Sequence, residues 1–97
     1  ASKSAILQMT MTLGALYAEQ GIRVNGITPG WIATKMTALT QSNDAANEQI
    51  IARTPMGRWG APKDLAGTAL YLACDELAGF VTGVTIPVDG GLITTLV

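Results

Sequence analysis

Two short apolar segments, separated by a long stretch of helical patterns, constrain the fold of this chain most. The first, Ile22–Thr28, places Ile22 and Val24 on one side of an extended backbone and predicts a strand. The second, Val84–Val88, contains Pro87, which cannot donate to a hydrogen-bond ladder and therefore favours the edge of a sheet. A strand, a long crossover with helices and a second strand are typical of a right-handed parallel unit. The sequence therefore predicts an α/β fold.

Helical patterns surround these strands, over residues 2–20, 43–53 and 62 to about 79. In the first, apolar residues recur at spacings of three and four, and Gly21 follows where a helix end favours a left-handed residue. The second is more polar, which suits a mobile lid. The third begins with Pro62 and has a predicted buried stripe. The predicted apolar positions are Ile6, Met9, Leu13, Leu16 and Tyr17 in the first helix and Leu65, Ala69, Leu72 and Ala73 in the third.

Charge and hydropathy exclude several classes of function. Only 13% of the residues are charged, the net charge is −1, and no basic run occurs, which argues against a nucleic-acid-binding surface. No stretch reaches the roughly 20 apolar residues of a membrane-spanning helix, and the first residues lack the cationic segment of a signal peptide. We therefore expect a cytoplasmic protein with no nucleic-acid or membrane partner.

Cysteine and histidine counts bound the chemistry further. With one cysteine, Cys74, and no histidine, the chain lacks the residues for an internal disulfide, a Cys/His zinc cluster or a Ser-His triad. We therefore expect no metal site. Cys74 falls on the apolar side of the third predicted helix and is interpreted as a buried packing thiol.

Four short motifs follow one another along the chain. They are Ala-Ser-Lys-Ser-Ala at residues 1–5, Val-Asn-Gly-Ile-Thr-Pro-Gly at 24–30, Pro-Met-Gly-Arg-Trp-Gly at 55–60 and Val-Asp-Gly-Gly at 88–91. Together they resemble the C-terminal part of a short-chain dehydrogenase/reductase, over nearly the whole chain. The resemblance implies that residues 1–97 are a single partial domain. This would be the C-terminal fragment of a doubly wound Rossmann-like parallel sheet, with its last two strands and the flanking helices.

Lys3 is the first candidate site residue that the resemblance implies. It matches the lysine of the family's Tyr-x-x-x-Lys motif, whose tyrosine would lie before Ala1. In the family this lysine lowers the pKa of the tyrosine and hydrogen-bonds the cofactor ribose, which implies catalytic and cofactor-binding roles for Lys3. The alternative, from the residues alone, is a solvated charge near a chain start.

The loop after the first predicted strand is the second candidate site. Open α/β sheets bind ligands beyond the carboxyl ends of their strands. The resemblance implies that Pro29, Gly30, Ile32 and Thr34 hold the nicotinamide of NAD or NADP, and Trp31 is interpreted as a substrate-pocket residue. The alternative is that Pro29 and Gly30 only turn the chain and that Thr34 caps the next short helix.

Other polar residues are interpreted as structural. Asn25 in the first strand is expected to form hydrogen bonds, and Asp89 to bind nearby backbone amides. Arg58 and Trp59, between two glycines, are interpreted as anchors of their loop, with contact to substrate or to another subunit as the alternative.

The function implied by the resemblance is NAD(P)-dependent interconversion of a secondary alcohol and a ketone. The motifs are most similar to those of members that act on sugar acids and polyols, such as gluconate 5-dehydrogenases. The 97 residues contain no glycine-rich dinucleotide motif and neither the catalytic tyrosine nor the catalytic serine of the family. We therefore expect the isolated chain to be inactive and to bind no cofactor tightly, because hydride transfer needs a bound, aligned cofactor.

A non-catalytic, self-associating binding or assembly module is the alternative function. Two parallel strands are too few for an independently stable sheet, and an exposed strand edge recruits another chain. We therefore expect a homo-oligomer that uses the open edge of the Ile22–Thr28 strand. The family resemblance implies a subunit interface through residues 65–77 and 84–97, as an alternative to that edge or in addition to it.

Overall fold

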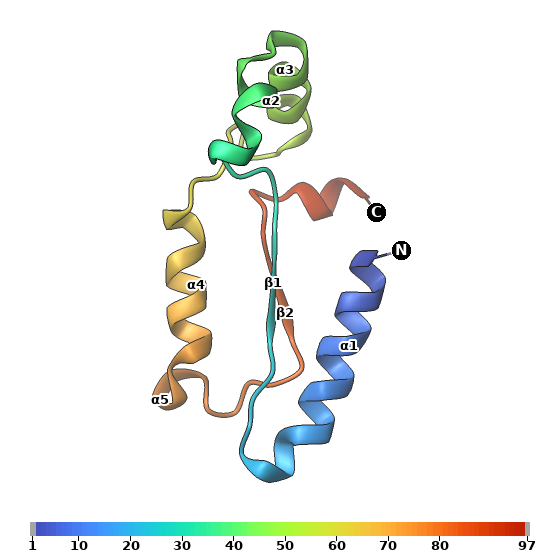
Figure 1. Ribbon diagram of the computed structural model, residues 1–97, viewed down its shortest axis with the longest axis vertical. Coiled ribbons are helices and arrows are strands. Elements are labelled where there is room, and N and C mark those ends of the chain that lie inside the picture. Colours follow the sequence, from blue (N-terminus) through green and yellow to red (C-terminus); the bar gives the residue numbers. More distant parts are fainter. Residues whose placement is uncertain (1, 97) are drawn as a thin grey trace. The chain divides into compact units, whose positions relative to one another are not determined.

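The computed structural model describes residues 2–96 and the side chains of residues 4–94. Its sheet consists of two strands, β1 (Gly26–Pro29) and β2 (Thr85–Val88), which lie side by side (Figure 1). The N–H of Gly26 donates to the carbonyl of Val84, and the N–H of Gly30 donates to that of Val88. Because both partners advance in the same direction, the strands are parallel. The predicted α/β fold is confirmed.

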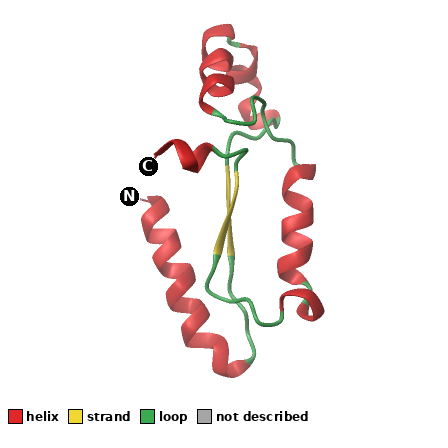
Figure 2. Ribbon diagram, turned by 180° about the vertical axis from the view of Figure 1, so that it is seen from behind, coloured by secondary structure: helices red, strands yellow, loops and turns green. Residues whose placement is uncertain are grey.

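Helical segments precede, separate and follow the two strands (Figure 2). They are α1 (Ser2–Tyr17), η1 (Ala18–Gln20), η2 (Lys35–Thr37), α2 (Ala38–Ser42), α3 (Asp44–Arg53), α4 (Lys63–Ala73), α5 (Asp75–Ala78) and η3 (Leu92–Leu96), where η denotes a 3-10 helix. The chain divides into two compact units. One contains the residues up to Ile27 and Thr68–Ile86, and the other contains Thr28–Gly67 and the residues from Pro87 on.

In the first unit, the prediction for the first helix is correct in extent. Helix α1 continues into η1, and Gly21 ends it in the left-handed region with φ 74°. The side that packs contains Thr10, which is 7% exposed, and Gly14. A Cβ atom on Gly14 would lie 2.6 Å from backbone atoms of Gly83, so only glycine permits this approach. The predicted apolar positions Ile6, Met9 and Leu16 are instead exposed.

Strand β1 is shorter than the predicted strand Ile22–Thr28, because side chains replace ladder bonds before Gly26. The N–H of Val24 donates to the hydroxyl of Thr82, and Asn25 donates to the carbonyl of Val81 while it accepts from the N–H of Val84. The interpretation of Asn25 as a structural hydrogen-bonding residue is confirmed.

The third predicted helix is interrupted before its predicted end near Gly79. Cys74 has extended backbone angles, with φ −89° and ψ 109°, and separates α4 from α5. Arg23 bridges the break: its guanidinium donates to the carbonyl of Leu72 at 2.7 Å and pairs with Asp75 at 2.7 Å. The predicted buried stripe is wrong at Ala69 and Ala73, which are exposed, and only half-buried at Leu65 and Leu72. Cys74 is half-buried and not a core thiol.

The second unit contains α3, which agrees closely with the predicted helix over residues 43–53. Asn43 caps it, since its side-chain oxygen accepts from the N–H of Ala46. Ile50 is 6% exposed, and the buried hydroxyl of Thr54 donates to the Ile50 carbonyl at 2.8 Å. These contacts fix the C-terminal end of α3 next to the segment that follows it.

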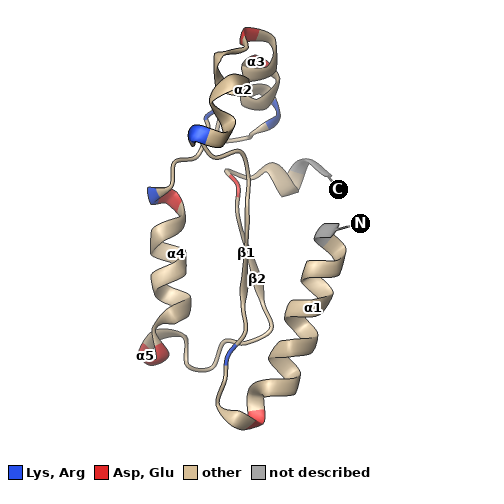
Figure 3. Cartoon of the chain, in the orientation of Figure 1, with Lys and Arg blue, Asp and Glu red and all other residues tan. Residues whose placement is uncertain are grey.

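Charged residues lie mainly at helix ends and in loops, as Asp64 and Asp75 do at the starts of α4 and α5 (Figure 3). Among residues 2–96, no helix is long and apolar enough to cross a membrane. In the same part of the chain, no group of three or more His, Cys, Asp or Glu side chains is arranged to hold a metal ion.

Candidate functional site

The candidate site begins where β1 and β2 end, within the second unit. The N–H of Gly30 donates to the carbonyl of Val88 at 3.1 Å, so the segments after both strands start side by side. A Cβ atom on Gly30 would lie 2.8 Å from the Cα of Asp89, which restricts this position to glycine. This edge of a parallel sheet is the usual ligand-binding edge of open α/β folds.

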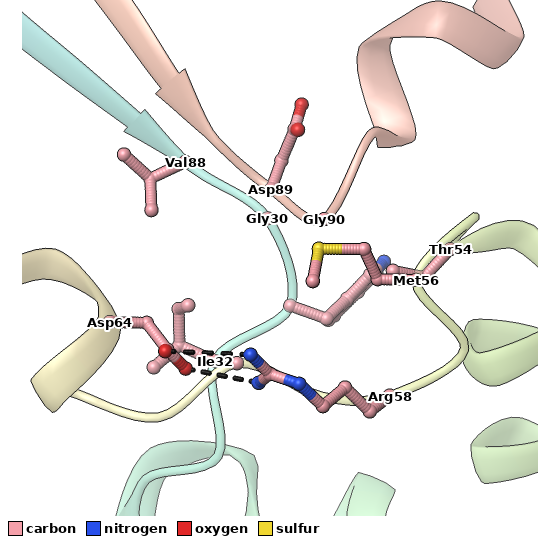
Figure 4. A pocket seen from close by; sticks show the side chains of 11 residues that line it. Gly30, Ile32, Thr54, Met56, Arg58, Asp64, Val88, Asp89 and Gly90 are labelled. Atoms are coloured by element: carbon pink, nitrogen blue, oxygen red, sulfur yellow. Dashed lines mark hydrogen bonds and ion pairs between the residues drawn. The ribbon is translucent and has the colours of Figure 1, made fainter.

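A cavity of about 220 Å³ lies at this edge (Figure 4). Its larger side chains are mostly apolar, which is typical of small-molecule sites. The lining residues are Gly30, Trp31, Ile32, Thr54, Met56, Arg58, Gly60, Asp64, Val88, Asp89 and Gly90. The cavity is therefore built from the loop after β1, the segment after α3, the start of α4 and the turn after β2.

Backbone hydrogen bonds hold the loop after β1 to the segment before α4. Ile32 and Gly60 form a parallel bridge, in which the N–H of Ala33 donates to Gly60 and the N–H of Gly60 donates to Trp31, each at 2.8 Å. A Cβ atom on Gly60 would lie 2.6 Å from the Cδ1 of Ile32. The loop after β1 and the segment before α4, which form two walls of the cavity, are thus joined directly.

Arg58 and Asp64 form an ion pair at the cavity, with 3.1 Å between Nη1 and Oδ2 (Figure 4). Asp64 also accepts from the backbone N–H of Ala61 at 2.7 Å, at the start of α4. The hydrogen bond from Arg58, supported by that of Ala61, lowers the pKa of Asp64, and the bond to Asp64 raises the pKa of Arg58. Both groups therefore stay charged near neutral pH, and the pair adds no net charge to the cavity.

Asp89 lines the cavity but is held by its own turn. Its two carboxylate oxygens accept from the backbone N–H groups of Gly91 at 2.9 Å and Ile93 at 3.0 Å. Figure 4 shows the Asp89 carboxylate directed away from the Arg58–Asp64 pair. The interpretation of Asp89 as a ligand of nearby amides is confirmed.

Thr34 is at the N-terminus of η2, as the capping alternative predicts. Its backbone N–H donates to the Thr37 hydroxyl at 2.9 Å, and that hydroxyl donates to the carbonyl of Ile32 at 2.9 Å. Gln41 donates to the carbonyl of Thr34 at 3.1 Å. These contacts show the structural role of Thr34, and its cofactor-binding role stays a prediction.

The structure brings three of the predicted site residues, Gly30, Trp31 and Ile32, together at one cavity. Pro29 ends β1 beside them and, like Thr34, is not among the lining residues. Lys3 lies in α1, in the other unit, and its side chain is outside the described residues. A role for Lys3 therefore stays a prediction.

Sequence reasoning missed Thr54, Met56 and Asp64 as cavity residues. By its position in the sequence, Asp64 is a favourable acidic residue in the first turn of a helix, which does not by itself indicate a cavity residue. Its pairing with Arg58, six positions earlier, depends on the path of the intervening loop. The signal available in the sequence was the block Pro55–Gly60, which carries the resemblance and whose Met56, Arg58 and Gly60 line the cavity.

A parallel strand pair with helical crossovers and a cavity at the carboxyl ends of the strands is the arrangement of Rossmann-like α/β proteins. A family model described as enoyl-(acyl carrier protein) reductase matches residues 1–93. The chain belongs to the short-chain dehydrogenase/reductase family.

Its relatives include dehydrogenases that are named for a sugar acid and for a polyol. The chain is 43% identical over 91 residues to 2-dehydro-3-deoxy-D-gluconate 5-dehydrogenase of Dickeya dadantii, with 94% of this chain and 36% of the relative covered. It is 44% identical over 91 residues to galactitol 2-dehydrogenase (L-tagatose-forming) of Cereibacter sphaeroides, with 94% of this chain and 35% of the relative covered. The chain therefore spans about a third of the length of these relatives.

A solved structure shows the same fold. The gluconate 5-dehydrogenase of Burkholderia cenocepacia, in complex with NADP and tartrate, superposes with a TM-score of 0.87 at 37% identity, covering 95% of this chain and 36% of that one. The 4-hydroxyisoleucine dehydrogenase complexed with NADH superposes with a TM-score of 0.89 at 35% identity, covering 96% of this chain and 38% of that one.

Proposed function

We propose that this chain contributes the loop Pro29–Thr34 and its cavity to an NAD(P)-dependent oxidoreductase that interconverts a secondary alcohol and a ketone. The observation that carries the proposal is the cavity itself, which lies at the carboxyl ends of two parallel strands and includes Gly30 and Ile32. The names of the relatives and the nicotinamide cofactors bound in similar structures support it.

The residues present fit a nicotinamide carboxamide. Within the part of the chain that the structure describes, the backbone N–H of Ile32 donates no hydrogen bond, although Ile32 lines the cavity. The oxygen of a carboxamide can accept a hydrogen bond from this N–H. Gly30, which has no side chain and packs on Asp89, lets the loop backbone lie close to the turn after β2.

The cofactor, when bound, would supply the hydride chemistry, and the protein would supply alignment. In this proposal the backbone at Gly30–Ile32 orients the nicotinamide. Lys3 keeps the role that the family resemblance implies, lowering the pKa of a tyrosine that acts as acid and base. Hydride transfer requires contact distance between nicotinamide and substrate, so alignment of this loop would set the rate.

For the substrate, we propose a sugar acid or a polyol. Trp31, 44% exposed, offers an aromatic surface at the cavity on which the carbon skeleton of such a molecule can pack. Arg58 is engaged by Asp64 and is thereby less available to an acidic substrate. Recognition in this proposal depends more on Trp31 and Met56 than on a free cation.

Turnover by the protein expressed from its whole coding sequence tests the proposal. The panel is 2-dehydro-3-deoxy-D-gluconate, L-tagatose, galactitol and a 3-oxoacyl thioester, each with NAD and NADP in the appropriate redox state. We expect turnover of at least one sugar-derived compound and a loss in Trp31→Ala, with Leu39→Ala, an exposed residue away from the cavity lining, as the matched control. No turnover of any compound and no nicotinamide binding would overturn it.

We also propose self-association, through residues 65–77 and 84–97, through the open edge of β1, or through both. Large apolar side chains in the first two ranges are exposed, including Leu70 at 71% and Leu77 at 69%. In the described sheet β1 has β2 as its one neighbour, which leaves a strand edge open to another chain. A native mass spectrum tests this directly: an oligomer is expected, and a monomer at micromolar concentration would contradict it.

The non-catalytic assembly module is the competing function, and the relatives, which are named as dehydrogenases and reductases, do not support it. The two functions differ in one observable. An oligomer that turns over a member of the panel supports the oxidoreductase, whereas an oligomer that neither binds a nicotinamide cofactor nor turns over substrate supports the module.

A further inference from the structure

Trp59 connects two elements beside the cavity. Its indole Nε1–H donates a 2.7 Å hydrogen bond to the Oδ1 of Asn47 in α3. Its ring meets that of Trp31 edge-on, with ring centroids 6.0 Å apart and an interplanar angle of 70°. Trp59 and Asn47 are half-buried, whereas Trp31 lines the cavity. One side chain therefore contacts both a helix and a cavity wall.

The backbone of Trp59 is fixed on the cavity side of this connection. Gly60, the next residue, donates to the carbonyl of Trp31 and accepts from the N–H of Ala33, each at 2.8 Å. The segment that carries Trp59 therefore moves with the loop after β1. Its side chain reaches from this paired backbone to α3.

Helix α3 contacts α2, and its first turns are joined to the segment 55–60 by Trp59. In the part of the chain that the structure describes, the Trp59–Asn47 bond is the one hydrogen bond between α3 and residues 55–60. The buried contacts of α3, at Ile50 and Thr54, lie near its C-terminal end. Asp44, Glu48 and Gln49, on the same helix, are exposed. Trp59 is thus the hydrogen-bonded link between the N-terminal half of α3 and residues 55–60.

We propose that Trp59 is a positioning residue, which ties the N-terminal half of α3 to the Trp31 wall of the cavity and thereby sets how tightly the cavity holds its substrate. This inference rests on the proposed function. It adds the residue that positions the helix over residues 43–53, whose sequence suits a mobile lid. The indole N–H supplies the tie and the aromatic ring supplies the wall contact, so the two can be separated by substitution.

Trp59→Phe and Asn47→Ala remove the hydrogen bond from opposite ends, and Trp59→Phe keeps a ring against Trp31. Asn47→Asp keeps an oxygen acceptor and serves as the conservative variant, and Gln49→Ala alters an exposed residue of the same helix as the matched control. All are made in the protein expressed from its whole coding sequence. If one of the first two fails to fold, the other still removes the bond.

The first readout is hydrogen exchange of the α3 amides, which needs no substrate or cofactor. Loss of a hydrogen bond of this kind is expected to speed exchange by about fivefold in Trp59→Phe and in Asn47→Ala. The double variant should exchange no faster than either single variant, because both remove one shared interaction. Asn47→Asp and Gln49→Ala should stay within about twofold of the unsubstituted protein.

The second readout separates KM from kcat for 2-dehydro-3-deoxy-D-gluconate. If the closed position of α3 is populated less, the apparent affinity falls by that fraction, so KM should rise by about fivefold while kcat changes little. Unchanged exchange in both bond-removing variants would overturn the tie, and faster exchange with an unchanged KM would overturn its role in substrate binding. Absence of turnover in the unsubstituted protein would count against the proposed function, while the exchange readout would still decide the tie.

Discussion

Gly30 and Asp89 lie in close contact at the ends of the two strands. A Cβ atom on Gly30 would be 2.8 Å from the Cα and 2.9 Å from the Cβ of Asp89. Backbone and a strand-end turn cannot rotate away as a flexible side chain can. This contact therefore fixes the distance between the loop that carries Trp31 and Ile32 and the turn that carries Gly90.

Substitution Gly30→Ala should destabilise the protein and impair the cavity together. The added methyl group must push the turn after β2 away, and overpacking of this kind costs about 1–3 kcal/mol. Chemical denaturation measures the free energy of unfolding. Gly67→Ala is the matched control: no atom lies within 4 Å of its added Cβ, and its place in helix α4 predicts a gain of about 0.5–1 kcal/mol. Equal stability of the Gly30 variant and the unsubstituted protein would contradict the contact.

Gly14→Ala sets helix propensity against packing. Alanine is favoured over glycine within a helix by about 1 kcal/mol, yet the new Cβ would lie 2.6 Å from the backbone of Gly83. We expect the steric term to dominate, so the thermal unfolding temperature should fall. A rise to the value seen for Gly67→Ala would show that α1 does not approach the turn at Gly83.

Arg23 should contribute more to stability than its ion-pair partner does. Its side chain is 15% exposed and its guanidinium satisfies the carbonyl of Leu72 at the end of α4, whereas Asp75 is 90% exposed. Arg23→Ala is therefore expected to lower the free energy of unfolding by about 1.5–3 kcal/mol, as for hydrogen bonds from charged groups. Asp75→Asn should cost about 0–1 kcal/mol, as exposed pairs do. Similar losses of unfolding free energy in Arg23→Ala and Asp75→Asn would show that the ion pair, and not the contact with the Leu72 carbonyl, stabilises the protein.

The pair Arg58–Asp64 predicts a pH dependence of stability at acidic pH. The pKa of Asp64 is lower in the folded protein than in the unfolded chain, so its contribution is present above the ordinary aspartate pKa of about 3.9. That contribution is lost as pH falls through the lowered folded value. The unfolding temperature of Asp64→Asn should therefore lie below that of the unsubstituted protein at neutral pH, and the two should converge in acid. A difference in unfolding temperature that stays constant from neutral to acidic pH would contradict the stabilising role of ionised Asp64.

The sequence correctly predicted the features that depend on contacts between residues close together in the chain. Gly21 ends η1, which continues α1, because glycine accepts a positive φ, and Asn43 caps α3 because its side chain reaches an amide three residues away. The turn residue Asp89 was placed correctly for the same reason. In each case the residue and its partner lie within four positions.

Contacts between distant residues decided the features that were wrong or missed. Strand β1 begins late because Asn25 bonds to residues 56 and 59 positions away, and Arg23 caps α4 from 49 positions away. In α1, the residues that pack in its unit are Thr10 and Gly14, whereas the apolar residues Ile6, Met9 and Leu16 are exposed. Hydrophobic periodicity alone does not report which side a neighbour occupies.

The most direct test of the central proposal is a crystal structure of the protein expressed from its whole coding sequence, with NADP or NAD bound. The account predicts the nicotinamide beside the loop Gly30–Ile32, with its carboxamide oxygen accepting from the backbone N–H of Ile32. A nicotinamide bound away from this loop, or no cofactor bound at saturating concentration, would contradict it.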